Sequence, residues 1–262
     1  MEIIEHGVCR LSVVPIRSEA AHTSEQVSQL LFGEEYEVTK FSEDKKWKRV
    51  RTTFDQYEGW IDARQHQGIT KEHYDYISRA EFKISLDVTS SLLYNKLPLP
   101  IVMGSIIPIS GSELFRMEEQ FAFNGESKPL GSKREFEFLR TVAMRYLNTP
   151  YQWGGKSPFG IDCSGFVQMV FKICGYRLLR DASQQASQGK PVDSFASALP
   201  GDVAFFKNEQ GKIVHTGIIL AENKIIHASG RVRIDTLDEK GILHSDTRQY
   251  THEIAHLRRI LA

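Results

Sequence analysis

One cysteine of this chain lies in a context that favours chemistry over packing. Cys163 follows a segment rich in Gly and Pro, residues 154–160, and precedes an apolar run with spacings of three, four and seven residues. That spacing predicts a buried helix that begins near Cys163 and ends at Gly175. Unpaired N–H groups and the helix dipole stabilise an anion at a helix N-terminus, so the pattern predicts a reactive thiolate with a lowered pKa.

The alternative is that Cys163 is a small buried apolar residue, as free cysteines usually are. The glycine-rich approach and the polar neighbours favour the reactive interpretation. Cys9 and Cys174 lie in apolar segments, and we expect both to be buried and unreactive. Three cysteines far apart in sequence form no disulfide framework and favour a reducing compartment.

A thiol nucleophile needs a base, and histidine is the usual one because its pKa lies near neutrality. His215 opens one strand-like run and His227 ends the next, so a short turn between antiparallel strands brings the two together. Cys163, His215 and His227 are also three plausible zinc ligands. No second Cys or acid lies beside them at ligand spacing, so we expect no metal and no cofactor. The other histidines are expected to be surface or structural residues: His6, His22, His66, His73, His244, His252 and His256.

The elements that must position these residues form the C-terminal half of the chain. Runs at 202–207, 214–220 and 224–227 alternate and are joined by tight turns, which predicts an antiparallel meander. Helical spacing begins at Glu135, with Ser132 as the candidate N-cap and Pro150 as the stop. Helices followed by strands indicate an α+β domain, which we place at residues 128–262.

The N-terminal half alternates in short runs separated by turns. Runs at 11–16, 29–32, 36–41, 47–50 and 59–61 predict a small β barrel over residues 1–70.

Residues 71–127 repeat this pattern less clearly and predict a second barrel, or else an insertion of the first. Pro98, Pro100 and Pro108 in this stretch favour edge strands.

Composition excludes some partners. Lys plus Arg and Asp plus Glu each total 33, so nothing suggests nucleic acid. The first residues contain two acids and no apolar run of secretory-signal length, and no segment is apolar enough to span a bilayer. We expect a cytoplasmic monomer without membrane contact. Export without a signal, or a leader already removed, is the alternative.

Four ordered motifs carry a resemblance to a known family. Pro-Tyr-x-Trp-Gly-Gly leads to Asp-Cys-Ser-Gly-Phe, and Pro-Gly-Asp-Val-Ala-Phe-Phe, His-Thr-Gly-Ile and Ile-His-Ala-Ser-Gly follow in this order. Together they resemble the NlpC-type papain-like cysteine peptidases of bacterial cell-wall metabolism. The upstream strands are similar to the SH3-like barrels of the subgroup that hydrolyses γ-D-glutamyl bonds to a diamino acid. The resemblance implies a papain-like C-terminal domain preceded by two small SH3-like β barrels.

Residue roles follow from the resemblance by position. Cys163 matches the nucleophile, His215 the general base and acid, and His227 the third residue that orients His215. Tyr151 matches a tyrosine proposed to stabilise the oxyanion. Asp162 is expected to bind the substrate amine, and Glu25 and Tyr57 are expected to close the amine end of the pocket. The residues that match substrate-binding positions are Trp153, Asp162, Ser164, Ser183, Glu25 and Tyr57.

The substrate implied by the resemblance is a free murein peptide, L-Ala-γ-D-Glu followed by meso-diaminopimelate or lysine, cleaved by a dipeptidyl-peptidase VI-like endopeptidase. A pocket closed around the free amine would exclude intact peptidoglycan, whose L-Ala is amide-linked. The function expected is therefore turnover or recycling of murein peptides. The alternatives are a secreted endopeptidase on intact peptidoglycan, a non-catalytic wall-binding protein, and a thiol acyltransferase.

Overall fold

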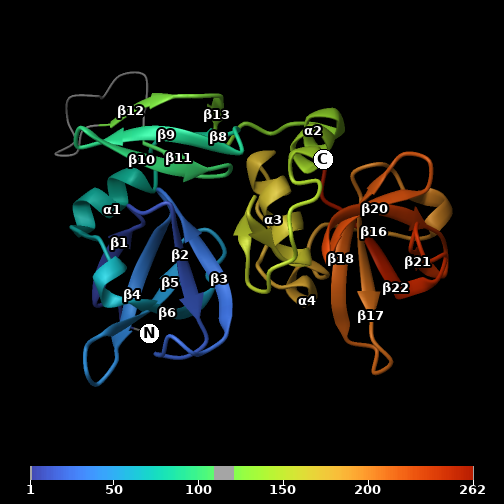
Figure 1. Cartoon of the computed structure of the whole chain (residues 1–262), viewed down its shortest axis with the longest axis horizontal. Helices are drawn as coiled ribbons and strands as arrows, with labels where there is room; N and C mark the ends of the chain where they lie inside the picture. Colours follow the sequence, from blue (N-terminus) through green and yellow to red (C-terminus); the bar gives the residue numbers. More distant parts are fainter. Residues whose placement is uncertain (1, 109–120, 262) are drawn as a thin grey trace. The chain divides into compact units, whose positions relative to one another are not determined.

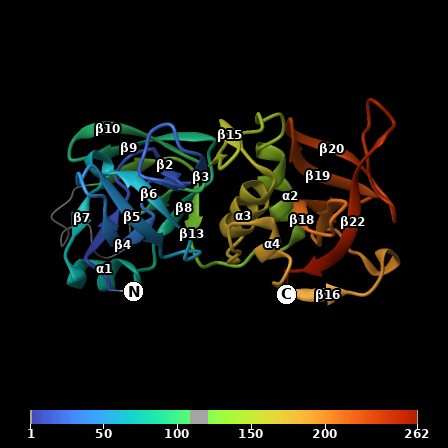
Figure 2. The same ribbon diagram turned by 90° about the horizontal axis from the view of Figure 1, so that it is seen from below.

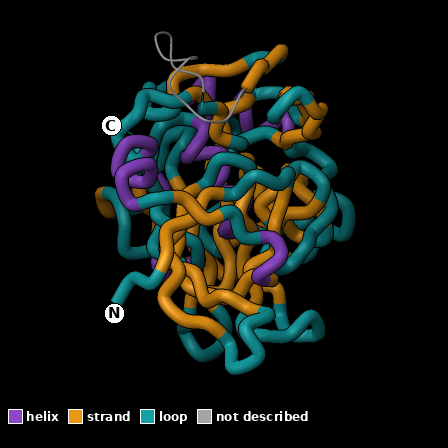
Figure 3. The backbone as a smooth tube through the Cα atoms, turned by 90° about the vertical axis from the view of Figure 1, so that its left-hand side faces the viewer, coloured by secondary structure: helices purple, strands orange, loops and turns teal. Residues whose placement is uncertain are grey.

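The computed structural model describes residues 2–108 and 121–261. Contacts within the chain define two compact units. The first comprises residues 1–132 together with 154–158, and the second comprises residues 133–153 together with 159–262. Strands predominate, and the helices are few and short (Figure 3). No helix in the described part of the chain is long and apolar enough to cross a membrane.

The first unit is built from a seven-stranded antiparallel sheet with the order β3-β2-β6-β5-β4-β1-β7. Its strands are β1 (Glu5–Val8), β2 (Val13–Arg17), β3 (Gln26–Leu31), β4 (Glu35–Phe41), β5 (Trp47–Thr52), β6 (Glu58–Asp62) and β7 (Gly68–Ile69). They confirm the strands expected from the alternating pattern. Alternation places one set of apolar side chains inside the sheet, and Val14, Tyr36 and Ile61 are among the residues buried there.

Two three-stranded sheets complete this unit, with the orders β10-β9-β12 and β11-β8-β13. The elements are the helix α1 (Lys71–Ile77), β8 (Lys83–Ser85), β9 (Thr89–Tyr94), β10 (Leu97–Val102), β11 (Ile106–Ile107), β12 (Phe121–Asn124) and β13 (Ser127–Pro129) (Figure 1). Pro98 and Pro100 lie in β10, an edge strand, as expected from their missing N–H groups. The helix α1 does not follow from the alternating pattern, and Thr70 caps it by accepting a hydrogen bond from the His73 N–H.

The expected boundary between two barrels at residue 70 stays a prediction. Phe32 packs with Leu92 and Phe121, and Val8 packs with Phe82. The two predicted barrels therefore share apolar side chains within one compact unit. The 3-10 helix η1 (Ala63–Gln65) and the short strand β14 (Lys156–Ser157) also belong to this unit.

The second unit packs helices on a sheet that closes on itself. The strand order is β16-β22-β17-β18-β19-β20-β21, and β21 also pairs with β22, so six of the strands form a closed antiparallel barrel. The elements are α2 (Phe136–Arg145), β15 (Gly160–Ile161), α3 (Cys163–Ile173), α4 (Ala182–Gln185), β16 (Lys190–Val192), η2 (Phe195–Ser197), β17 (Val203–Lys207), β18 (Ile213–Leu220), β19 (Lys224–Ser229), β20 (Arg231–Leu237), β21 (Gly241–Leu243) and β22 (Tyr250–Arg259). This confirms the α+β class and the meander, and it adds β20 to β22.

The helix α3 is the centre of the second unit. Every residue from Cys163 to Ile173 is buried, and the helix lies beside β18 and packs against α2 (Figures 1 and 2). Gly175 follows its end with a left-handed φ of 84°, as predicted. The prediction of Ser132 as the cap of α2 is wrong, because the N-cap is Glu135, whose side chain makes no capping bond.

Candidate active site

Cys163 is the first residue of α3. Asp162 is the N-cap, and its carboxylate accepts a hydrogen bond of 2.7 Å from the Gly165 N–H. The cysteine is 7% exposed. The predicted position of the thiol at the start of a buried helix is therefore confirmed.

The predicted lowering of the Cys163 pKa is wrong. Burial raises the pKa of the thiol to about 12, and the adjacent Asp162 carboxylate raises it further. Hydrogen bonds with the backbone of Thr216 and Ser164 favour the thiolate but offset only part of this effect. Desolvation thus outweighs the helix terminus, and the resting side chain is a neutral thiol that needs a base.

The contact with Thr216 places the thiol beside β18, one residue beyond His215. Gly217, two residues after His215 in β18, pairs with His227 of the neighbouring strand β19. This register brings the two imidazoles together. His215 Nε2 lies 2.8 Å from His227 Nδ1. The expected meeting of the two histidines is confirmed.

The histidines lie on the inner face of the closed barrel. Alternation puts His215 on the side of Ile219 and puts His227 on the side of Ile225, and both isoleucines belong to the apolar core of the barrel. Burial lowers the pKa of His215 well below its ordinary value and lowers that of His227. Both rings are therefore neutral near pH 7.

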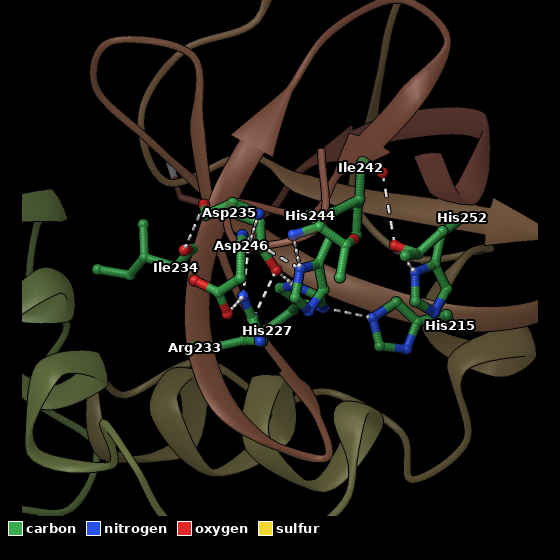
Figure 4. A network of polar contacts seen from close by, with 12 residues as sticks. His215, His227, Arg233, Ile234, Asp235, Ile242, His244, Asp246 and His252 are labelled. Carbon is green, nitrogen blue, oxygen red and sulfur yellow. Dashed lines mark hydrogen bonds and ion pairs between the residues drawn. The ribbon is translucent and has the colours of Figure 1, made fainter. Parts of the chain in front are cut away.

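Sequence reasoning missed the group that follows His227. Its Nε2 lies 2.9 Å from Asp235 Oδ2, on β20 (Figure 4). The Arg233 guanidinium donates to both Asp235 oxygens, at 2.8 and 2.9 Å, and the Ser245 N–H donates to Oδ1 at 2.8 Å. The one signal in the sequence is that Asp235 lies two residues before the apolar Leu237, so both side chains face the same side of a strand.

His252 was also missed. It was expected to be a surface or structural residue, but its ring stacks on His215 with a centroid distance of 4.0 Å and an interplanar angle of 24°. Burial and the nearby His227 lower the pKa of His252 to about 4. The stacked ring is therefore neutral and covers one face of the His215 imidazole.

Comparison with known proteins decides the family. Residues 148–250, which include Cys163, His215 and His227, match the NlpC/P60 family, and residues 16–65 match the bacterial dipeptidyl-peptidase SH3 domain. The chain carries an NlpC/P60 domain of the cysteine peptidase type and an N-terminal bacterial SH3 domain.

Two curated relatives match most of this peptidase. It is 29% identical over 223 residues to the gamma-D-glutamyl-L-lysine dipeptidyl-peptidase of Bacillus subtilis, covering 77% of this chain and 71% of that protein. It is 29% identical over 251 residues to dipeptidyl-peptidase 6 of Lysinibacillus sphaericus, covering 84% and 88%. A crystal structure of an NlpC/P60 family protein from Bacillus cereus superposes with a TM-score of 0.82 at 19% identity, covering 98% of this chain and 100% of that one. The latter supports the fold alone.

The peptidase holds Asp162 in a buried ion pair that the sequence did not reveal. Arg180, which is 1% exposed, donates to both Asp162 oxygens at 3.0 and 2.6 Å and to Ser164 Oγ at 2.9 Å. The arginine therefore offsets the charge that was expected to bind a substrate amine. The role of Asp162 in binding an amine stays a prediction, now with a competing partner for its carboxylate. Ser183 lies exposed in α4.

Tyr151 lies near the thiol. Its N–H donates to the Gly230 carbonyl at 3.0 Å, and its backbone bridges Ile161, two residues before Cys163. Burial and the charges of Cys163 and Asp162 raise the pKa of the phenol, so it stays protonated and can donate a hydrogen bond.

The remaining predicted residues are divided between the two units. Trp153 is 61% exposed in the second unit. Glu25 is exposed directly before β3, and Tyr57 is half-buried before β6; both belong to the first unit. Their roles stay predictions. No group of three or more potential metal-ligating side chains able to hold an ion was found in residues 2–108 and 121–261.

Proposed function

We propose that this peptidase hydrolyses the amide between γ-D-Glu and the diamino acid of free peptides that begin with L-Ala-γ-D-Glu. The observation that carries the proposal is the combination, in one chain, of the NlpC/P60 match with the bacterial dipeptidyl-peptidase SH3 match. The relative from Bacillus subtilis, named for γ-D-glutamyl-L-lysine bonds, supports the choice of bond.

Cys163 is the proposed nucleophile and His215 the proposed base. As Cys163 Sγ bonds to the carbonyl carbon of the γ-D-Glu side chain, His215 Nδ1 takes the thiol proton. The C–N bond then breaks, and the leaving amine receives that proton from His215. A water molecule, deprotonated by His215, cleaves the resulting thioester and restores the thiol.

Because burial raises the pKa of the Cys163 thiol and lowers that of His215, the neutral pair is favoured at rest, and proton transfer accompanies attack. The protonated Tyr151 hydroxyl and the Cys163 N–H are the proposed donors to the tetrahedral oxyanion. His227 orients the His215 ring through the bond of 2.8 Å.

The proposed substrate-binding residues are Trp153, Asp162, Ser164, Ser183, Glu25 and Tyr57. An N-acylated peptide has no ammonium to offer a carboxylate among these residues and adds an acyl group where the pocket is proposed to close, which disfavours intact peptidoglycan. We therefore propose that a monomeric enzyme cleaves released murein peptides during turnover in the cytoplasm.

The test compares L-Ala-γ-D-Glu-L-Lys with its N-acetyl derivative. We expect the free peptide to yield L-Ala-D-Glu and lysine, with kcat/KM reduced at least about 100-fold for the acetylated peptide, since acetylation removes the charged group that the pocket is proposed to bind. Equal cleavage of both peptides, or cleavage of purified peptidoglycan at a similar rate, would contradict the proposal. Cell fractionation tests the cytoplasmic location.

A further inference from the structure

The chain of polar side chains inside the second-unit barrel does not end at the two histidines (Figure 4). We propose that Asp235 is a positioning residue that sets the proton pattern of His227 and His215, so that His215 presents a bare Nδ1 to the thiol. This inference rests on the proposed function, in which His215 acts as the base.

The first step is that Asp235 is held as an acceptor. Arg233 donates to Oδ2 through Nε and to Oδ1 through Nη2, and the Ser245 N–H donates to Oδ1. An arginine keeps its charge at every accessible pH, so it fixes the carboxylate in its ionised form. Hydrogen bonds from His227, Arg233 and Ser245 lower the pKa of Asp235 strongly, although its burial acts in the opposite direction.

The second step follows the protons along the chain. Since an ionised carboxylate only accepts, the 2.9 Å contact requires that His227 Nε2 carries a hydrogen. Neutral His227 then has a bare Nδ1, which accepts from His215 Nε2 at 2.8 Å. Neutral His215 with its hydrogen on Nε2 has a bare Nδ1. One carboxylate thus determines two tautomers in series.

The third step is that the rings are held against rotation. The His252 ring stacks on the His215 ring with a centroid distance of 4.0 Å, and the centroids of the Phe206 and His215 rings lie 5.7 Å apart. His227 and Asp235 are both about 1% exposed. When His215 accepts the thiol proton, its positive charge develops in line with a fixed carboxylate, which stabilises the imidazolium.

The variant that tests this is Asp235→Asn. The Oδ1 position faces two fixed donors, Arg233 Nη2 and the Ser245 N–H, whereas Oδ2 faces one fixed donor, Arg233 Nε, and the His227 ring, whose hydrogen can move to the other nitrogen. The amide oxygen therefore takes the Oδ1 position and the NH₂ group faces His227. Donation from the amide moves the His227 hydrogen to Nδ1 and, in turn, the His215 hydrogen to Nδ1. The base is then blocked, and we expect kcat on L-Ala-γ-D-Glu-L-Lys to fall on the order of 10³-fold with KM within about twofold.

A matched control exists in the same barrel. Asp202 is buried, accepts two bonds of 2.8 Å from Arg259 and one of 2.8 Å from the Leu199 N–H, and has no bond to a histidine. Asp202→Asn should lower the urea midpoint about as much as Asp235→Asn does but leave kcat within about twofold. A purely structural role for Asp235 predicts equal effects of the two variants on kcat.

The direct readout is ¹⁵N NMR of protein labelled at histidine, without substrate. We expect Nε2–H tautomers for His215 and His227 in the wild type and Nδ1–H tautomers in Asp235→Asn. An Nδ1–H tautomer of wild-type His215, or a kcat of Asp235→Asn within about threefold of the wild type, would overturn the inference. The wild-type spectrum needs neither a substrate nor a variant. It therefore tests the inference even if the proposed function is wrong or if Asp235→Asn fails to fold.

Discussion

Two buried carboxylates, one in each unit, have partners of different kinds. Glu34 in the first unit meets Lys156 Nζ at 3.1 Å, and their side chains are 4% and 2% exposed. Asp235 in the second unit meets His227 at 2.9 Å. Burial is similar, but the Lys156 amine is a point donor on a flexible stem, whereas His227 is a neutral ring with one nitrogen that donates and one that accepts. The nature of the partner, not the burial of charge, distinguishes a structural ion pair from a hydrogen-bonded chain that sets the tautomers of the histidines.

The Glu34–Lys156 pair has a structural task of its own. It joins residues 122 positions apart and holds the segment 154–158 in the first unit. The Lys156 N–H also donates to Gln29 Oε1 at 2.7 Å, and a Cβ on Gly154 would lie 2.3 Å from the Gln26 carbonyl oxygen. The glycine-rich segment thus reflects close packing as much as chemistry. Arg180 and Asp162 form a second fixed pair, in the second unit.

The largest expected effect comes from removing His215 from the hydrogen-bonded chain of the second unit. His215→Ala removes the base, so we expect kcat on the tripeptide to fall on the order of 10⁴-fold while the urea midpoint changes little. The matched control is His22→Ala, at an exposed histidine of the first unit, which should keep wild-type kinetics. Substantial activity in His215→Ala would contradict its role.

The next effect breaks the fixed pair. Lys156→Met leaves Glu34 buried without its cation, and we expect a loss of about 3–5 kcal/mol in the free energy of unfolding, measured in urea. Adding Glu34→Gln removes the uncompensated charge and should recover most of the loss. Activity per folded molecule should stay within about threefold of the wild type. A double variant as unstable as the single one would show that the charge pair is not the cause.

The smallest expected effect is on the pH dependence of stability, to which the buried His252 ring of the second unit contributes. The pKa of His252 is about 4 when folded and 6.5 for the free side chain, so the unfolded chain binds this proton more readily. The stability due to the neutral ring is present above pH 6.5 and is lost as the pH falls toward 4. His252→Phe keeps a stacked ring and should reduce the loss of unfolding free energy between about pH 7 and about pH 4.5 by about 1–2 kcal/mol, allowing for partial exposure.

Urea unfolding of wild type and variant at the two pH values measures this difference. His22→Phe, at the exposed histidine of the first unit, serves as the control and should leave the pH dependence unchanged. Identical pH dependence of His252→Phe and the wild type would contradict the assignment.

Local patterns predicted the strands of the first sheet, the meander from β17 to β19, and the helix that begins at Cys163. Those features depend on spacing within a short stretch. Asp235, which extends the polar chain beyond His227, could not be predicted from such patterns. Its strand, β20, has an inward face only when β21 pairs with β22 and closes the barrel. Asp235 therefore resembles a surface residue in the sequence.

Two further differences have physical causes. Arg180 lies in a loop 18 residues from Asp162, so their pairing depends on tertiary structure. The pKa of Cys163 was predicted from the helix terminus alone, yet the thiol is buried, and desolvation outweighs the dipole. Sequence position indicated which residues meet, and the folded environment determines their protonation.

Product analysis of L-Ala-γ-D-Glu-L-Lys incubated with the wild type and with Cys163→Ala tests the central claim most directly. We predict that the wild type releases free lysine and L-Ala-D-Glu in equal amounts and that Cys163→Ala releases neither above background. Release of lysine by Cys163→Ala at the wild-type rate, or no cleavage by the folded wild type, would contradict the account.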